Sequence, residues 1–153
     1  MFTSPVLFVD ETDLRSYSPS AYIIPASAKT GLGIENILEA IINRVPCPSG
    51  DVSKPLQALI FDSVYNPFRG IETYFRVIDG SIKKNQKIKF LATNKAYGAD
   101  EVGTLNLKQS PKQEIFAGDV GYLITGIKEA KEVKVGDTIT DFEKPTDDAI
   151  SGF

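Results

Sequence analysis

The chain has 153 residues, of which 42% are hydrophobic and 24% charged, values typical of a folded globular protein rather than a disordered or fibrous one. Its 20 acidic and 17 basic side chains give a net charge of −3, so bulk electrostatics does not favour nucleic acid or an anionic membrane. The absence of histidine excludes imidazole catalysis and Ser-His or Cys-His dyads. A single cysteine, Cys47, excludes an internal disulfide and suits a reducing compartment.

The first predicted element is an amphipathic helix over residues 34–45, with Gly31 and Gly33 marking its start. Its apolar residues recur every three or four positions, which places them on one face of a helix. They are Ile34, Ile37, Leu38, Ile41, Ile42 and Val45. Residues 46–55 then bring together three prolines, a glycine and small polar residues, and proline does not continue a helix. We therefore predict a linker over residues 46–55.

After the linker the pattern changes to short β-rich runs separated by Gly, Asn, Pro or Asp. These runs are residues 56–65, 71–80, 86–92, 101–107, 119–127 and 136–140. With no second helix of comparable quality, they predict a mainly β fold: a closed or nearly closed antiparallel barrel over residues 56–142, followed by a tail over residues 143–153. The predicted core consists of Leu59, Phe61, Phe75, Val77, Ile88, Phe90, Val120, Leu123 and Ile139. Tight turns are predicted at Asp79-Gly80 and Lys84-Asn85.

The loop before the helix carries a chemical signal. Ser27, Ala28 and Lys29 follow a β-like run and precede the helix, which is the form of the last guanine-contacting loop of many GTPases. In such a loop a backbone N–H can donate to guanine O6, an acceptor that adenine lacks, while the lysine stem lies against the ring. The three residues alone are equally typical of an ordinary strand-to-helix turn.

A family resemblance rests on five longer stretches. These are SAKTGLGIENILEAI (27–41), FDSVYNPFRG (61–70), VIDGSIKKNQKI (77–88), AGDVGYLITGIK (117–128) and VGDTIT (135–140). Together they resemble elongation factor 4, the LepA-type translational GTPases, over residues 26–140. The resemblance implies that residues 1–45 are the end of a GTP-binding domain, residues 56–142 are the second, β-barrel domain of a translation factor, and residues 143–153 lead toward a third domain.

The resemblance also implies what these residues do not contain. The family hydrolyses GTP with a phosphate loop of the form G-x-x-x-x-G-K-[ST], bound Mg²⁺, and a water-positioning histidine, and none of these motifs is intact here. We therefore expect no catalytic residue, no cofactor and no metal in this chain, and no GTPase activity from it alone. GTP and Mg²⁺ belong to the parent family. Asp13 is a candidate relic of the N-K-x-D specificity motif, although residues 1–24 are equally interpreted as unrelated sequence.

The barrel then carries the expected function. By resemblance it binds the ribosome at the RNA of the small subunit. Arg69, with Tyr65 and Phe68 as stacking surfaces, is a candidate RNA contact in a Pro- and Gly-containing loop. The alternative is that Tyr65 and Phe68 cap the barrel. Further candidate phosphate contacts are two groups of lysines, which are otherwise simply solvated: Lys83, Lys84, Lys87 and Lys128, with Lys89, Lys131 and Lys134 in the same two groups.

The apolar face of the predicted helix implies further partners. This face is expected to pack on the parent GTPase domain or, in this chain alone, on the short N-terminal segment, on the barrel or on a second copy of the chain. No apolar run reaches membrane-spanning length, and the resemblance implies a cytoplasmic protein, peripheral at the inner membrane in some conditions for the parent family. The alternative function is a free-standing barrel that binds RNA or protein without nucleotide chemistry.

Overall fold

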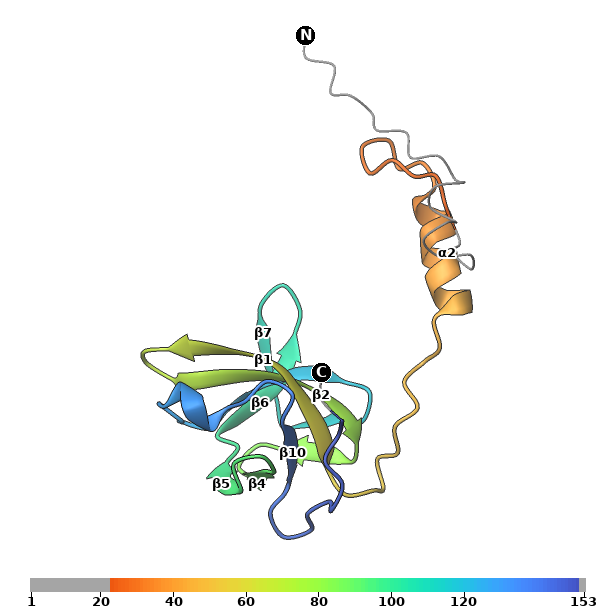
Figure 1. The fold of residues 1–153 in the computed structure, drawn as a ribbon. Helices are drawn as coiled ribbons and strands as arrows, with labels where there is room; N and C mark the ends of the chain where they lie inside the picture. Colours follow the sequence, from red (N-terminus) through yellow and green to blue (C-terminus); the bar gives the residue numbers. More distant parts are fainter. Residues whose placement is uncertain (1–22, 152–153) are drawn as a thin grey trace. The chain divides into compact units, whose positions relative to one another are not determined.

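The computed structural model describes residues 23–151 (Figure 1). Its internal contacts divide the chain into two units, Met1–Cys47 and Pro48–Phe153, and each unit is described by itself. Within the described residues no helix is long and apolar enough to cross a membrane.

The first unit holds the helix α2, Ile34–Arg44. Gly33 is its N-cap and has a φ of 73°, a left-handed conformation that favours glycine. A Cβ at this position would also lie 2.2 Å from the carbonyl oxygen of Pro25, so only glycine fits. The helix ends at Arg44 because Val45 is already extended and Pro46 follows. None of the residues of α2 is fully buried by the other described residues of the first unit.

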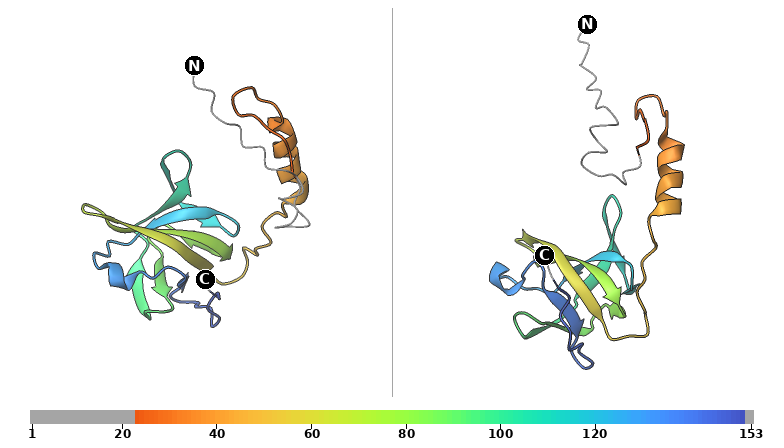
Figure 2. Two further views of the ribbon diagram at one scale, coloured as in Figure 1. Left: turned by 45° about the horizontal axis from the view of Figure 1, so that its top comes forward. Right: turned by 45° about the vertical axis from the view of Figure 1, so that its right-hand side comes forward.

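The second unit is built from ten short strands. They are β1 Gln57–Asn66, β2 Gly70–Asp79, β3 Ser81–Lys83, β4 Lys87–Phe90, β5 Lys95–Gly98, β6 Glu101–Leu105, β7 Gln109–Lys112, β8 Glu114–Phe116, β9 Val120–Ile124 and β10 Thr138–Asp141. Eight of them form one antiparallel sheet in the order β5-β4-β10-β1-β2-β9-β6-β7, and β3 pairs with β8. Figure 2 shows the strands of this unit curving around a common interior. The mainly β, antiparallel barrel fold predicted from the sequence is confirmed.

One apolar core fills this interior. Its cluster draws residues from both sheets, including Ile82 on β3 and Ile115 on β8. The largest side chains with no exposed surface include Phe75 on β2 and Phe90 on β4, and Ile60 on β1 belongs to the same cluster.

Three of the nine predicted core residues are not in the core. Phe61 is 39% exposed and Val120 is 46% exposed, while Leu59 is half-buried. The pairing of β1 with β2 shifts between Ile60 and Asp62, so Phe61 is the extra residue of a β-bulge. Val120 pairs with the exposed Arg76 and shares its outward face.

The prediction from the sequence also did not include four of the strands: β3, β5, β7 and β8. Each has three or four residues, too few to show alternation, and β7 (QSPK) contains a proline. Pro111 is tolerated because β7 lies at the edge of the eight-stranded sheet. The two predicted turns are confirmed, since Gly80 (φ 75°) and Asn85 (φ 65°) both adopt left-handed conformations.

The tail beyond β10 lies against the barrel. The Thr146 N–H donates to Oγ1 of Thr140 at 2.8 Å, and the Ile150 N–H donates to Oγ1 of Thr138 at 2.9 Å. The Nε2 of Gln57 donates to the carbonyl of Asp148 at 2.7 Å. These bonds hold the tail alongside β10 and β1.

Candidate nucleic-acid interface

The loop between β1 and β2 presents two aromatic side chains to solvent. Tyr65 is 57% exposed and Phe68 is 97% exposed, so they do not cap the barrel, and that alternative is wrong. The Asn66 side chain shapes the turn, because its Oδ1 accepts from the N–H groups of Phe68 at 3.0 Å and Arg69 at 3.3 Å. The loop therefore offers aromatic surface from a defined turn, the arrangement on which unstacked bases are bound in many RNA-binding proteins.

Gly70 closes this loop in a conformation that other residues resist. Its φ is 84°, and a Cβ there would lie 2.4 Å from the carbonyl oxygen of Ile127. The Ile71 N–H donates to that same carbonyl at 2.6 Å, which fastens the start of β2 to the segment after β9.

The side chain of Arg69 is partly exposed and is held by hydrogen bonds to its neighbours. Its Nη2 donates to Oε1 of Glu101 at 2.6 Å, and its Nη1 donates to Oε1 of Gln109 at 2.9 Å. Oε1 of Glu72 lies 3.8 Å from Nη1 as well. The hydrogen bond to Glu101 raises the pKa of Arg69 further above its ordinary value, against the effect of burial. The guanidinium therefore joins the β1–β2 loop to β6 and β7.

The carboxylates around Arg69 have additional donors. Glu72, only 7% exposed, accepts from Nδ2 of Asn66 at 2.9 Å and from Nε2 of Gln109 at 2.7 Å. Glu101 accepts from the Tyr122 hydroxyl at 2.8 Å. Burial opposes ionisation of Glu101, but the hydrogen bonds from Tyr122 and Arg69 outweigh it and lower its pKa. We call this set the Arg69 network: Asn66, Arg69, Glu72, Glu101, Gln109 and Tyr122.

Sequence reasoning singled out Arg69 but missed its partners. Glu72 lies in an otherwise β-rich run, and a charged residue in such a run is a weak signal for a buried, hydrogen-bonded group. No local signal connects Glu101 or Gln109 with Arg69, because folding alone brings β6 and β7 to the loop.

The Arg69 network makes stability depend on alkaline pH. Burial, together with the hydrogen bond to Glu101, raises the pKa of Tyr122 to about 12. An unfolded tyrosine ionises near pH 10, so between about pH 10 and about pH 12 the unfolded chain releases a proton that the folded chain keeps. Stability should therefore fall over that range, and Tyr122→Phe should make the fall shallower.

Urea denaturation at a series of pH values tests this expectation. Burial and a hydrogen bond to Glu132 also raise the pKa of Tyr97 to about 12. Tyr97 should therefore leave part of the pH dependence of stability in the Tyr122→Phe variant. An identical pH dependence in Tyr122→Phe and the unchanged protein would contradict the assignment.

The four candidate lysines differ in their surroundings. Nζ of Lys83 lies 3.6 Å from Oε1 of Glu114, and Nζ of Lys87 lies 3.6 Å from the centre of the Phe142 ring. Lys84 and Lys128 are exposed, and their side chains make no hydrogen bond or ion pair with the described residues. Lys84 lies close enough to Glu101, the partner of Arg69, to contribute to lowering the pKa of that carboxylate. The role of the four lysines in RNA binding stays a prediction.

The guanine-loop residues form a compact turn in the first unit. The Ser27 N–H donates to the carbonyl of Leu32, and the Gly31 N–H donates to the carbonyl of Ser27, both at 2.9 Å. Ala28 and Lys29 are exposed. Asp13 lies outside the described residues. Across residues 23–151, no three Cys, Asp or Glu side chains gather closely enough to hold a metal ion.

Comparison with known proteins identifies the class of protein domain to which the second unit belongs. Residues 70–140 match the family described as Elongation factor Tu domain 2. The bacterial selenocysteine-specific elongation factor EF-Sec, in its crystal structure, superposes with a TM-score of 0.66 at 20% identity, over 88% of this chain and 25% of that chain. The identity is too low to carry more than the fold. The second unit is thus a translation-factor domain of the elongation factor Tu domain 2 type.

Close relatives narrow the assignment. The chain is 72% identical over 144 residues to elongation factor 4 of Christiangramia forsetii, covering 94% of this chain and 24% of the relative. It is 69% identical over 131 residues to elongation factor 4 of Flavobacterium johnsoniae, covering 86% of this chain and 22% of the relative. The chain belongs to the elongation factor 4 family, as the resemblance indicated, and spans about a quarter of the length of these relatives.

Proposed function

We propose that the second unit docks on the RNA of the small ribosomal subunit as the barrel domain of an elongation-factor-4-type translational GTPase acting in translation elongation or back-translocation. The high identity to elongation factor 4 over most of the chain carries this proposal. The exposed aromatic pair Tyr65 and Phe68 supports it, because bases of any sequence can stack on such side chains. A net charge of −3 makes local contacts of this kind necessary.

The Ser27–Lys29 turn and α2 are proposed to be the end of the GTP-binding domain. Without a phosphate loop among these residues, the turn offers guanine contacts but no phosphate contacts, and the phosphate contacts dominate affinity in this class. GTP and Mg²⁺ then bind residues of the longer protein, and the 153 residues alone hydrolyse no GTP. The longer protein is proposed to work in the cytoplasm, where ribosomes are.

The apolar face of α2 is proposed to pack on that GTP-binding domain. Leu38 is 55% exposed, Ile41 50% and Ile42 78%, and such a face is covered in a stable protein. In the isolated chain, self-association through this face is the expected substitute.

Co-sedimentation with purified small ribosomal subunits tests the docking proposal. The 153-residue chain should bind at low salt, and Phe68→Ala should weaken binding about tenfold, because one stacked base contributes about 1–3 kcal/mol. Phe116→Ala is the matched control, since Phe116 is a partly exposed aromatic residue on β8 and not part of the loop.

The outcomes separate the proposal from its alternative. Equal binding by Phe68→Ala and Phe116→Ala would remove the aromatic loop from the interface. If the barrel is folded but neither the unchanged chain nor any variant binds small subunits, autonomous docking is contradicted. That result would favour a free-standing barrel with another RNA or protein partner.

A further inference from the structure

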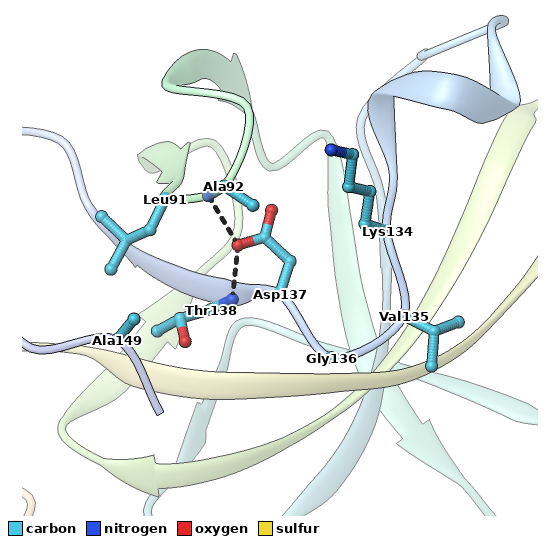
Figure 3. A pocket seen from close by; sticks show the side chains of 8 residues that line it. All are labelled: Leu91, Ala92, Lys134, Val135, Gly136, Asp137, Thr138 and Ala149. Carbon is cyan, nitrogen blue, oxygen red and sulfur yellow. Dashed lines mark hydrogen bonds between the residues drawn. The ribbon is translucent and has the colours of Figure 1, made fainter. Parts of the chain in front are cut away.

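A hollow of about 430 Å³ lies beside the start of β10, in a part of the barrel that the proposed aromatic loop does not use. Its walls come from three segments: Leu91 and Ala92 after β4, residues 134–138 before and at the start of β10, and Ala149 in the tail (Figure 3). A volume of this size is within the range that takes a small-molecule group.

A buried carboxylate with one unused oxygen lines this hollow. Asp137 is 5% exposed, and its Oδ1 accepts from the N–H groups of Ala92 at 2.8 Å and Thr138 at 2.7 Å. Its Oδ2 is buried and has no hydrogen-bond partner among the described residues. Buried polar atoms nearly always have a partner, and an unpaired one costs free energy. Figure 3 shows Oδ2 turned away from the two bonded N–H groups, toward the space between Ala92 and Lys134.

Lys134 supplies a charge of the opposite sign at the rim. Its side chain is exposed and makes no hydrogen bond or ion pair with the described residues, and Figure 3 shows its Nζ extended over the same space. Three further residues of the lining are apolar: Leu91, Val135 and Ala149. The hollow thus has an acceptor inside, apolar walls, and a cation at the edge.

We propose that this hollow binds one unstacked nucleotide of single-stranded RNA, with an amino group of the base donating to Asp137 and the phosphate at Lys134. The inference rests on the proposed RNA-docking function. It adds to the aromatic loop a second RNA contact, which distinguishes between bases. A nucleotide carries the matching kinds of group: N–H donors at the base edge, an apolar ring face and an anionic phosphate. A basic peptide side chain would instead have to pass Lys134 to reach Asp137.

The geometry also selects among bases. A carboxylate oxygen accepts from the N4 amino group of cytosine, whereas uracil presents the O4 acceptor at that position. Cytidine should therefore bind more tightly than uridine. Asp137→Asn should reverse this order, because the asparagine Oδ1 can still accept from Ala92 and Thr138 while its amide nitrogen turns a donor toward the base.

Fluorescence anisotropy with oligocytidylate and oligouridylate of about eight nucleotides tests the proposal with the full chain. We expect about tenfold tighter binding of oligocytidylate, and the reverse preference in Asp137→Asn. Asp100→Asn removes the same charge from an exposed site outside the hollow and should keep the original preference. Lys134→Ala should weaken the binding of both oligonucleotides equally, and the slope of log K against log salt concentration should fall by about one phosphate contact. Lys112→Ala is the control and should change neither, because Lys112 is exposed on the edge strand β7.

Two outcomes would overturn this inference. One is equal binding of both oligonucleotides by the unchanged protein; the other is an unaltered preference in an Asp137→Asn variant whose thermal unfolding shows that it is folded. If small subunits still co-sediment in either case, the docking proposal stands and only the nucleotide site fails. Binding of a short lysine-containing peptide that Asp137→Asn abolishes, with no oligonucleotide binding, would assign the hollow to a protein ligand instead.

Discussion

Replacing Phe75 by alanine is expected to lower the free energy of unfolding of the second unit by about 3–5 kcal/mol. Phe75 has no exposed surface and belongs to the core cluster. It pairs with Ile60 on β1 and Gly121 on β9, so the cavity left by its ring would open in the core on the inner face of these neighbouring strands. Chemical denaturation followed by far-ultraviolet circular dichroism measures the change, since strand content is lost on unfolding.

Phe68→Ala is the matched control for this experiment. The chemical change is the same, but Phe68 is 97% exposed, so its removal should alter stability by no more than about 0.5 kcal/mol. The two variants should thus have opposite phenotypes: one loses stability, and the other loses ribosome binding. Equal destabilisation by both would show that the aromatic loop packs on the barrel in solution.

The same two phenylalanines show what sequence patterns can predict. Phe75 lies in a run that alternates apolar and other residues, with Ile71, Thr73 and Val77 on the buried face, and alternation predicts a strand with one face in the core. Phe61 lies in an equally apolar run, yet a bulge exposes it. A bulge adds one residue to one strand of a pair, so its presence depends on the partner strand and leaves no period in the sequence.

The aromatic loop was predictable because its signals are local. Asn66, Pro67 and Gly70 each favour a turn, and turns present side chains to solvent. The Asp137 hollow was not predictable for the opposite reason. Residues 136–140 were interpreted as a strand, whereas Gly136 (φ 87°) and Asp137 form a turn before β10, and the partner of Asp137 is the backbone of Ala92, distant in sequence.

Substitutions in the Arg69 network are expected to weaken ribosome binding because Arg69 holds the loop that carries Tyr65 and Phe68. Arg69→Ala removes the only cation in the network, leaving Glu72 and Glu101 with fewer donors, at a cost of about 1–3 kcal/mol in stability. The loop between β1 and β2 then loses its tie to β6 and β7, and small-subunit binding should fall about tenfold, as for the loss of one stacked base. Arg69→Lys should not restore binding, because an ammonium group cannot span Glu101 and Gln109 as the planar guanidinium does.

Glu101→Gln distinguishes this positioning role from the direct RNA contact that the sequence suggested for Arg69. A direct contact predicts unchanged or stronger binding, because the substitution frees the guanidinium and removes a negative charge from the interface. A positioning role predicts weaker binding, because the bond that fixes Arg69 at 2.6 Å loses its charge and is weakened, although the Gln oxygen can still accept from Arg69 and Tyr122. The two roles therefore predict changes of opposite sign in one co-sedimentation experiment. Glu129→Gln, which removes the same charge from an exposed site paired only with Lys131, corrects for the general electrostatic effect.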